Sequence, residues 1–180
     1  MIRDNFKARP KSIEDIRNLA ALLREFLGLG PNDRIDFNVH LDLISILLVK
    51  ENFAYIVLED HDLIFDENDE AHTNVKTGAI YIKESVYRNL KDPSSRSHFT
   101  IAHEIGHFFL HYINGPLLSR KNKPIKAYES PEWQANQFAA ELLMPYDAVK
   151  TMSIEEIYST YKVSYKAAEV RFNKINKKRS

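Results

Sequence analysis

Two histidines and a glutamate lie close together in the sequence, at His103, Glu104 and His107. In an α-helix, residues four apart lie one above the other on the same face. His103 and His107 therefore direct two imidazole rings at one point, and imidazole nitrogen is a preferred ligand of zinc. Glu104 lies at the edge of that face, where its carboxylate can take a proton from water activated by the metal. The spacing predicts a hydrolytic metal site.

The segment around this motif has apolar residues at helical spacing, which predicts a buried stripe beside the histidines. The stripe consists of Phe99, Ala102, Ile105 and Phe109. We expect the helix to begin with Asp92 as its N-cap and to continue to about Tyr112. Chance occurrences of His-Glu-x-x-His often fall in loops or on polar surfaces, so the position in a long apolar helix favours a metal site.

A catalytic zinc site needs a third protein ligand and one open position for water. One class of peptidase extends the motif with Gly-x-x-His, but Leu110 and Ile113 occupy those positions here. We therefore expect the third ligand to be Glu132, near the start of a helix over residues 130–144. Asn136 lies one turn further on the same face. Its amide oxygen can accept the free ring N–H of a ligand histidine and fix the tautomer of that ring.

Other side chains are weaker alternatives for the third ligand. Glu129 falls in a loop, and Glu141 points away from the face of Glu132. His111 continues the face of His107 but lies too far along the same helix to reach the same ion. The remaining alternative is that Glu132 is only a surface acid at a helix N-terminus, a favourable place for a negative charge.

Helical and strand-like patterns elsewhere predict an α+β fold, with a mainly helical core, a small three-stranded sheet and a C-terminal helical pair. Helices are expected after Ser12 and over residues 36–49, and strands over 53–58, 63–65 and 79–82. Residues 1–11 are interpreted as a loose basic lead-in. We expect a peptidase domain over residues 1–152 and a helical segment over residues 153–180 packed on it.

Composition narrows the class of protein. The chain has 180 residues and no cysteine, which excludes a disulfide framework and thiolate catalysis. No apolar run is long enough to span a membrane, and the first residues lack the apolar region of a secretory signal. These features predict a soluble cytoplasmic protein without a membrane partner.

The charges are balanced overall, with 25 basic and 25 acidic residues, but they are unevenly distributed. Residues 162–180 contain seven basic residues and one acidic residue, Glu169. The two short helices expected over residues 153–176 have a tight connection that resembles a helix-turn-helix. A plain helical hairpin is the commoner arrangement, and the net charge of zero argues against broad nucleic-acid binding. We therefore expect no nucleic-acid partner.

The two motifs together resemble the ImmA/IrrE family of metallopeptidases over about residues 77–146. The resemblance rests on His103-Glu104-Ile105-Gly106-His107 and on Glu132-x-x-Ala135-Asn136-x-Phe138-Ala139-Ala140-x-Leu142-Leu143-Met144-Pro145. It implies a zincin-like fold and an endopeptidase that uses zinc, with Mn²⁺ as an alternative ion in the cell. It also implies cleavage of a helix-turn-helix repressor in mobile-element or stress-response circuits. Thermolysin-like peptidases have Asp where this chain has Asn136.

Two other classes of function remain open at this point. One is a DNA-binding regulator with a vestigial peptidase site, and the other is a toxin–antitoxin-type interaction protein with a structural metal. The intact Glu104 favours catalysis, since a structural site needs no base. We expect an extended substrate to bind along the strand over residues 79–82. Candidates for a further oxyanion donor are Tyr112, Tyr128, Tyr146 and His111.

Overall fold

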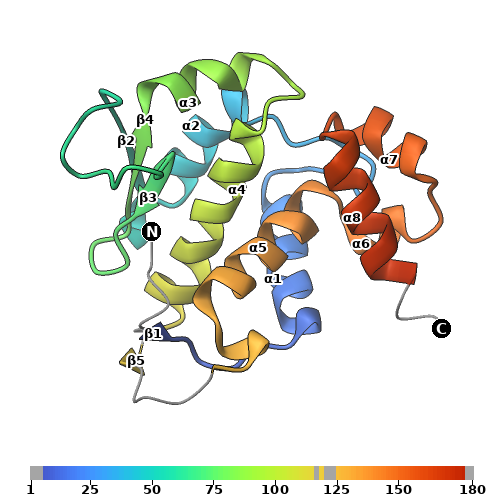
Figure 1. The fold of residues 1–180 in the computed structure, drawn as a ribbon, viewed down its shortest axis with the longest axis horizontal. Helices are drawn as coiled ribbons and strands as arrows, with labels where there is room; N and C mark the ends of the chain where they lie inside the picture. The colour runs from blue at the N-terminus through green and yellow to red at the C-terminus, as the bar shows by residue number, and fades with distance from the viewer. Residues whose placement is uncertain (1–5, 116–117, 120–124, 177–180) are drawn as a thin grey trace.

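The computed structural model describes residues 6–115, 118–119 and 125–176, and it confirms the α+β class (Figure 1). None of the helices within these ranges is both long and apolar enough to cross a membrane. The helices are α1 (Ile13–Phe26), α2 (Phe37–Leu47), α3 (Glu84–Arg88), α4 (Ser97–His107), α5 (Pro131–Leu143), α6 (Tyr146–Val149), α7 (Ile154–Tyr161) and α8 (Tyr165–Asn176). The strands are β1 (Phe6–Lys7), β2 (Ala54–Leu58), β3 (Ala71–Thr73), β4 (Ala79–Lys83) and β5 (Leu118–Ser119).

The main sheet has three strands in the order β2-β4-β3, and it lies on one side of α4 (Figure 1). Strand β4 pairs with β2 in parallel and with β3 antiparallel. The strands expected over residues 53–58 and 79–82 are confirmed by β2 and β4. Because β4 is the middle strand, both of its sides are already paired, so the expectation that a substrate pairs with residues 79–82 is wrong.

The third strand is not the one expected from the sequence. Residues 63–65 form turns, in which the Phe65 N–H donates to the Asp62 carbonyl and the Leu63 side chain is fully exposed. The third strand is β3, whose Ala71 and Thr73 side chains are buried. A short Ala-His-Thr strand carries little intrinsic β signal, and it forms because β4 provides a partner.

Helix α4 begins at Ser97, five residues after the expected N-cap. The Asp92 carboxylate instead accepts hydrogen bonds from the Ser94 N–H and hydroxyl, which closes a local turn before the helix. At the other end the helical backbone continues as a π-helical segment, η3 (Phe108–Ile113), close to the end expected at Tyr112. Such wide turns often occur next to functional sites.

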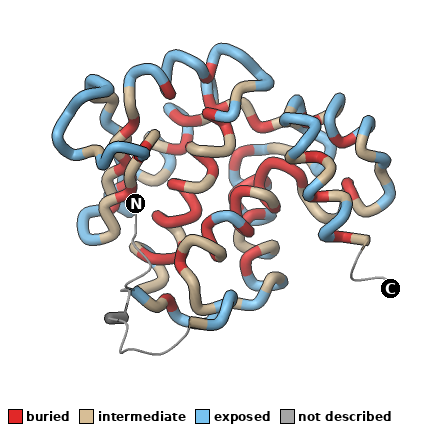
Figure 2. The backbone as a smooth tube through the Cα atoms, viewed as in Figure 1, coloured by how far each residue is buried: buried red, intermediate tan, exposed pale blue. Residues whose placement is uncertain are grey.

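Helices α4 and α5 cross at very short range, and the segments buried around their crossing form the centre of the core (Figure 2). Ala135 is completely buried at the contact. A Cβ atom built at Gly106 would lie 3.1 Å from Phe138 Cδ1 and 3.2 Å from Ala135 Cα. Only a glycine therefore allows the two backbones this approach without a shift of the neighbouring atoms.

The basic lead-in is packed rather than loose from Phe6 onward. Strand β1 pairs antiparallel with β5. Ala8 is buried, and its N–H donates to the Glu129 carbonyl at 2.8 Å. Glu129 lies in the short 3-10 helix η4 (Ala127–Glu129), directly before α5. The N-terminal segment therefore contacts the chain at the start of the helix that carries Glu132.

The expected helical pair at the C-terminal end is confirmed by α7 and α8, and α8 packs on α5 through a buried ion pair. Arg171 Nη1 and Nη2 donate to the two Glu141 oxygens at 3.1 and 2.6 Å, and both side chains are almost fully buried. Arg171 Nε also donates to the Met144 carbonyl. This pairing accounts for Glu141 as a structural acid rather than a metal ligand.

The Arg171–Glu141 pair leads to a stability prediction. Arg171→Met should lower the free energy of unfolding by about 3–5 kcal/mol, because it leaves a buried carboxylate without its main partner. The double variant Arg171→Met/Glu141→Leu should recover part of this loss, since both charges of the pair are removed and only the nearby Arg17, 3.5 Å from Glu141, loses a partner. Urea unfolding of both single variants and the double variant measures the coupling. A single variant within about 1 kcal/mol of wild type would show that the pair does not hold α8 in place.

Candidate metal centre

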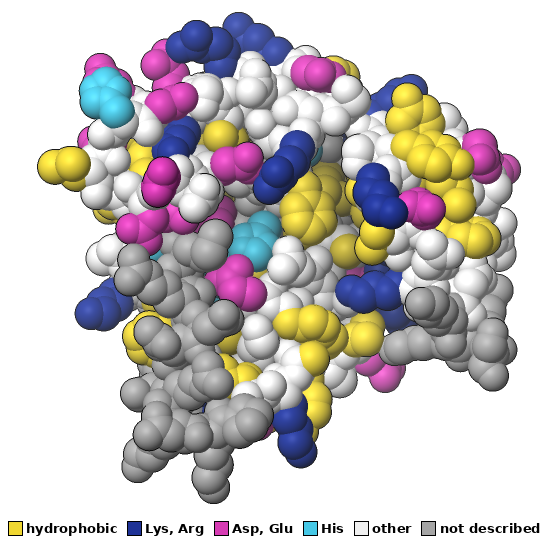
Figure 3. Space-filling model, in the orientation of Figure 1, with side chains coloured by type: hydrophobic (Ala, Val, Ile, Leu, Met, Phe, Trp, Pro, Cys, Tyr) yellow, Lys and Arg dark blue, Asp and Glu magenta, His cyan; other side chains and the backbone are white. Residues whose placement is uncertain are grey.

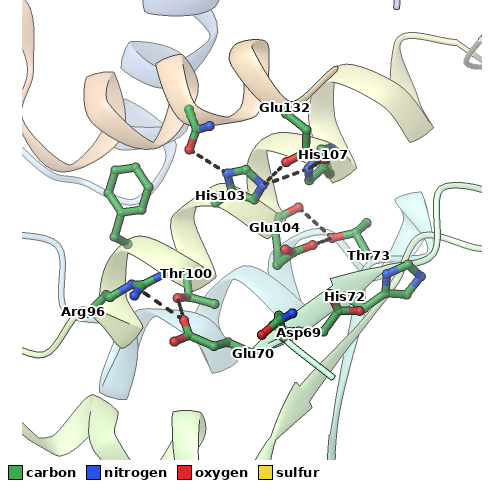
Figure 4. A pocket seen from close by; sticks show the side chains of 14 residues that line it. Asp69, Glu70, His72, Thr73, Arg96, Thr100, His103, Glu104, His107 and Glu132 are labelled. Atoms are coloured by element: carbon green, nitrogen blue, oxygen red, sulfur yellow. Dashed lines mark hydrogen bonds and ion pairs between the residues drawn. The ribbon is translucent and has the colours of Figure 1, made fainter. Parts of the chain in front are cut away.

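The structure brings His103 and His107 of α4 together with Glu132 of α5 (Figure 4). The two histidine Nε2 atoms lie 2.9 Å apart. Glu132 Oε2 lies 3.3 Å from His103 Nε2, and Glu132 Oε1 lies 3.5 Å from His107 Nε2. Glu132 is placed by the N-terminus of α5, where Pro131 occupies the first position and the Ser130 hydroxyl accepts from the Trp133 N–H.

These three side chains fit a divalent metal ion. Ligand atoms about 2.0–2.1 Å from a tetrahedral zinc ion lie roughly 3.3 Å from one another, and the distances in this cluster, 2.9, 3.3 and 3.5 Å, lie around that value. Glu132 Oε1 is buried and has no hydrogen-bond partner among the described residues. A buried carboxylate oxygen facing two imidazole nitrogens is a favourable environment for a cation.

The charge state of the cluster also suits a cation. Burial alone would raise the pKa of the Glu132 carboxyl, but the contacts with His103 and His107 hold that pKa well below its usual value. Burial alone would lower the pKa of His103, but Glu132 and the nearby Glu104 carboxylate hold it above its usual value. The glutamate is therefore ionised at neutral pH, and a proton competes with a metal ion for the His103 nitrogen.

Asn136 lies where the sequence places it, one turn after Glu132 and next to His103. Asn136 Oδ1 is 3.1 Å from His103 Nδ1. An amide oxygen can only accept, so this contact places a proton on Nδ1 and leaves the lone pair of Nε2 facing the cluster. The predicted tautomer-fixing contact is thus present in the structure.

A second hydrogen-bonded chain, which the sequence analysis missed, holds His107. Gln134 Nε2 donates to the Arg9 and Tyr128 carbonyls at 2.8 and 2.7 Å, so Gln134 Oε1 faces His111 Nε2 at 3.2 Å as an acceptor. His111 then carries its proton on Nε2 and accepts on Nδ1 from His107 Nδ1 at 2.9 Å.

His111 is neutral because it is buried, and its contact with His107 leaves the Nε2 lone pair of His107 directed at the cluster. Burial, followed by the neighbouring His107, lowers the pKa of His111 to about 3. The sequence contains one hint of this chain, since His111 lies one turn after His107. The contribution of Gln134 depends on the Tyr128 carbonyl six residues before it and on the distant Arg9 carbonyl. His111 is therefore a partner of a candidate ligand and lies outside the group of three side chains that converge.

Glu104 points from α4 toward the sheet. Its Oε2 accepts a hydrogen bond of 2.6 Å from the Thr73 hydroxyl of β3, which also contacts the Glu104 carbonyl at 3.0 Å. Both residues are buried. The carboxylate is thus held on the sheet side of the histidines without joining the cluster (Figure 4). Thr73 is a further residue that the sequence did not reveal, since it belongs to the strand that was not predicted.

The cluster opens into a cleft of about 220 Å³ between α4, α5 and strand β3. Strand β3 forms an edge of the described sheet and one wall of this cleft. The four side chains expected as oxyanion donors, Tyr112, Tyr128, Tyr146 and His111, are absent from its described lining. The lining consists of Asn68, Asp69, Glu70, Ala71, His72, Thr73, Arg96, Phe99, Thr100, His103, Glu104, His107, Glu132 and Asn136.

A His-Glu-x-x-His helix beside a small sheet, crossed by a helix that carries a glutamate, has the architecture of the zincin-like metallopeptidases. The family model of the IrrE N-terminal-like domain, Peptidase_M78, matches residues 59–173. This match covers more than half of the chain, and the protein therefore belongs to this family of metallopeptidase-like domains. The match extends past the two motifs and includes α7 and most of α8.

No curated protein matches the sequence significantly. A solved structure described as a Mycobacterium tuberculosis transcriptional regulator has a TM-score of 0.54 and 12% sequence identity. The similarity covers 88% of this chain and 47% of the regulator, so the chain spans about half of that protein's length. At this identity the similarity concerns the fold alone.

The cluster leads to a prediction about metal binding. The purified protein should bind about one divalent ion per chain, with zinc preferred by two histidines and one carboxylate. His103→Ala or His107→Ala should abolish binding, and Glu132→Ala should weaken it strongly. Glu129→Ala is the control, because this acid pairs with Lys7 at 2.6 Å instead. Elemental analysis and titration against a chelator measure the affinity, and full retention in Glu132→Ala would remove it from the ligand set.

The two hydrogen-bonded partners of the histidines lead to a separate prediction. Asn136→Ala and Gln134→Leu should each lower metal affinity by about 10- to 100-fold, because each removes a group that fixes a histidine tautomer. Gln137→Leu is the matched control, since this buried amide of α5 donates to Glu141 Oε1 at 3.0 Å, away from the cluster. Metal titration is combined with unfolding of the metal-free proteins. Equal affinity in all three variants would show that these contacts only support the fold.

Proposed function

We propose that the protein is a zinc-dependent endopeptidase, with His103, His107 and Glu132 as metal ligands and Glu104 as the catalytic base. The observation that carries this proposal is the position of Glu104. Its carboxylate lies beside the three converging side chains but outside them, in a cleft bordered by an edge strand. A purely structural zinc site would be closed and would need no additional carboxylate at its opening.

The chemistry follows from the placement of the side chains. A bound divalent ion supplies Lewis acidity, which lowers the pKa of a water molecule and polarises the scissile carbonyl. The Glu104 carboxylate accepts the proton of the attacking water and delivers it to the leaving amine, so that the base is regenerated. The Thr73 hydroxyl holds one oxygen of Glu104, which keeps the other oxygen oriented into the cleft. Asn136 orients the ring of His103, and His111 orients that of His107.

Strand β3 indicates how a substrate lies in the cleft. An edge strand presents backbone N–H and C=O groups that can pair with an added strand. Since β3 borders the cleft next to Glu104, an extended peptide that pairs with β3 would pass the cluster within reach of the base. His72 of β3 also lines the cleft.

The proposed substrate class is a helix-turn-helix transcriptional repressor, as the ImmA/IrrE resemblance implies. A cleft that pairs with an extended segment cannot accept a folded helix bundle. Cleavage should therefore occur at one site in a linker or mobile loop of the repressor. Zinc is the proposed ion, and Mn²⁺ remains an alternative in the cell. The basic helix α8 gives no comparable support to DNA binding, because its Arg171 is buried in the pair with Glu141.

Replacement of the base tests the proposal. Glu104→Gln should fold and retain metal, but its cleavage of the repressor encoded beside the gene should fall by about 10²–10⁴-fold, since Gln cannot take a proton. Glu70→Gln is the control, because it removes a negative charge from the same cleft at a residue that accepts from Thr100 instead. Mass spectrometry of the fragments after co-incubation measures cleavage. Equal cleavage by Glu104→Gln would contradict the mechanism, and metal-loaded wild type that cuts no candidate would contradict the peptidase proposal.

A further inference from the structure

A second, larger groove lies next to the catalytic cleft, between the α4–α5 pair and helix α8. Its volume is about 530 Å³, within the range of roughly 300–1,000 Å³ that is typical of ligand sites. Figure 3 shows hydrophobic and basic side chains side by side on this face of the molecule. The apolar lining consists of Ile35, Pro93, Phe99, Ala140, Leu143, Met144, Tyr161, Val163, Ala167 and Val170.

The charged side chains of this groove all have the same sign. Six basic residues and no acidic residue are found among the described lining: Arg34, Arg96, Lys162, Lys166, Arg171 and Lys174. Four of them have acidic partners: Arg171 pairs with Glu141, Lys166 with Glu169 and Arg34 with Asp36, and Arg96 Nε lies 3.9 Å from Glu70. None of these acids belongs to the described lining of the groove. The side chains that face the groove therefore combine an apolar floor with a basic rim.

The groove is continuous with the catalytic cleft. Arg96, Phe99 and Asn136 line both. Asn136 also contacts His103, so the boundary between the cleft and the groove lies directly beside the cluster of His103, His107 and Glu132. A polypeptide that leaves the cleft on this side enters the groove directly. A segment bound in the groove and a segment bound in the cleft can therefore belong to the same substrate molecule.

The walls of the groove favour a helical occupant over an extended one. Helices α4, α5 and α8 supply about half of the described lining, and none of the described strands contributes to it, so the groove offers no strand edge to pair with. An extended chain would bury backbone groups here without partners, whereas a helix satisfies its own backbone and presents only side chains. The buried Arg171–Glu141 pair fixes α8 relative to α5, so the groove exists before any partner binds.

We propose that this groove is a docking site for an amphipathic, acidic helix of the protein substrate. The helix would place an apolar stripe on the groove floor and its Asp and Glu side chains against the positive rim. The inference rests on the proposed peptidase function, because the occupant is the part of the substrate that flanks the scissile segment. Docking at the groove would then select the substrate, while strand β3 holds the segment to be cut.

Selection of displayed helices tests the docking site without any catalysis. Two peptide libraries share apolar residues at i, i+3, i+4 and i+7, varied in identity, and differ only in flanks of Glu or of Lys. Each is selected on immobilised, metal-loaded Glu104→Gln protein, and the affinity of enriched peptides is measured by fluorescence anisotropy. We expect enrichment from the Glu-flanked library alone, with binding that weakens as salt concentration rises.

Three variants locate the binding surface. Val170→Asp places a negative charge on an exposed residue of the groove floor, and Lys166→Glu reverses a charge at the rim. Each should weaken binding of the enriched peptides by at least about tenfold. Ile46→Asp is the control, because it places the same charge on an exposed apolar residue of α2 outside the groove. Its binding should equal that of the parent protein.

Several outcomes would overturn the docking site. These are no enrichment from either library, equal enrichment from both, or binding that Val170→Asp leaves unchanged. Uptake of laurate by the groove in calorimetry, without any enriched helix, would assign it to small anionic amphiphiles instead. If the docking proposal is wrong but the peptidase proposal is right, the wild-type protein still cleaves the repressor although no selected helix binds in the groove. Failure of the peptidase function would appear as loss of cleavage while the enriched helices still bind, so the two failures are distinguishable.

Discussion

The close approach of α4 and α5 at Gly106 is the constraint on which the cluster of His103, His107 and Glu132 depends. His103 and His107 belong to one helix and Glu132 to the other, so their separation is set by how near the two backbones lie. With no side chain at Gly106, Phe138 and Ala135 pack directly against the α4 backbone. A larger residue would move α5 outward, and a shift of a few tenths of an ångström is already significant for metal–ligand distances. The core packing and the chemistry of the site therefore have the same structural cause.

Hydrogen bonds also orient the two imidazole rings of the cluster. Both histidines have their Nδ1 protons held by acceptors, Asn136 for one and His111 for the other, so both Nε2 lone pairs face inward. Two lone pairs and a carboxylate at short range repel one another in a buried site unless a proton or a cation lies between them. A cation held by these three side chains would relieve this repulsion. The cluster is thus arranged as a site that could hold a metal ion.

The parts of the site that depend on helical periodicity were predictable from the sequence, and the parts that depend on tertiary pairing were not. Spacing of four residues places His103 with His107 and Glu132 with Asn136, and the structure brings these side chains together. Strand β3 was missed because its pairing with β4, rather than its own residues, makes it a strand. Gln134 was missed for a similar reason, since its amide is oriented by the carbonyl of Tyr128 in the preceding loop and by that of Arg9, 125 positions away. Helix α4 also begins later than predicted, because Asp92 forms a local turn with Ser94 instead of capping the helix.

The contact between Gln134 and Arg9 has a consequence for folding. The three clustered side chains are separated by fewer than 30 residues, so they can assemble early with little loss of chain entropy. The Gln134–Arg9 hydrogen bond joins residues 125 positions apart, and it completes the chain that orients His107. The Arg9 carbonyl can accept this hydrogen bond only after the N-terminal segment has packed against the start of α5. The orientation of His107 is thus complete only in the fully folded chain, and a partly folded chain would hold a metal ion at this cluster more weakly than the native protein.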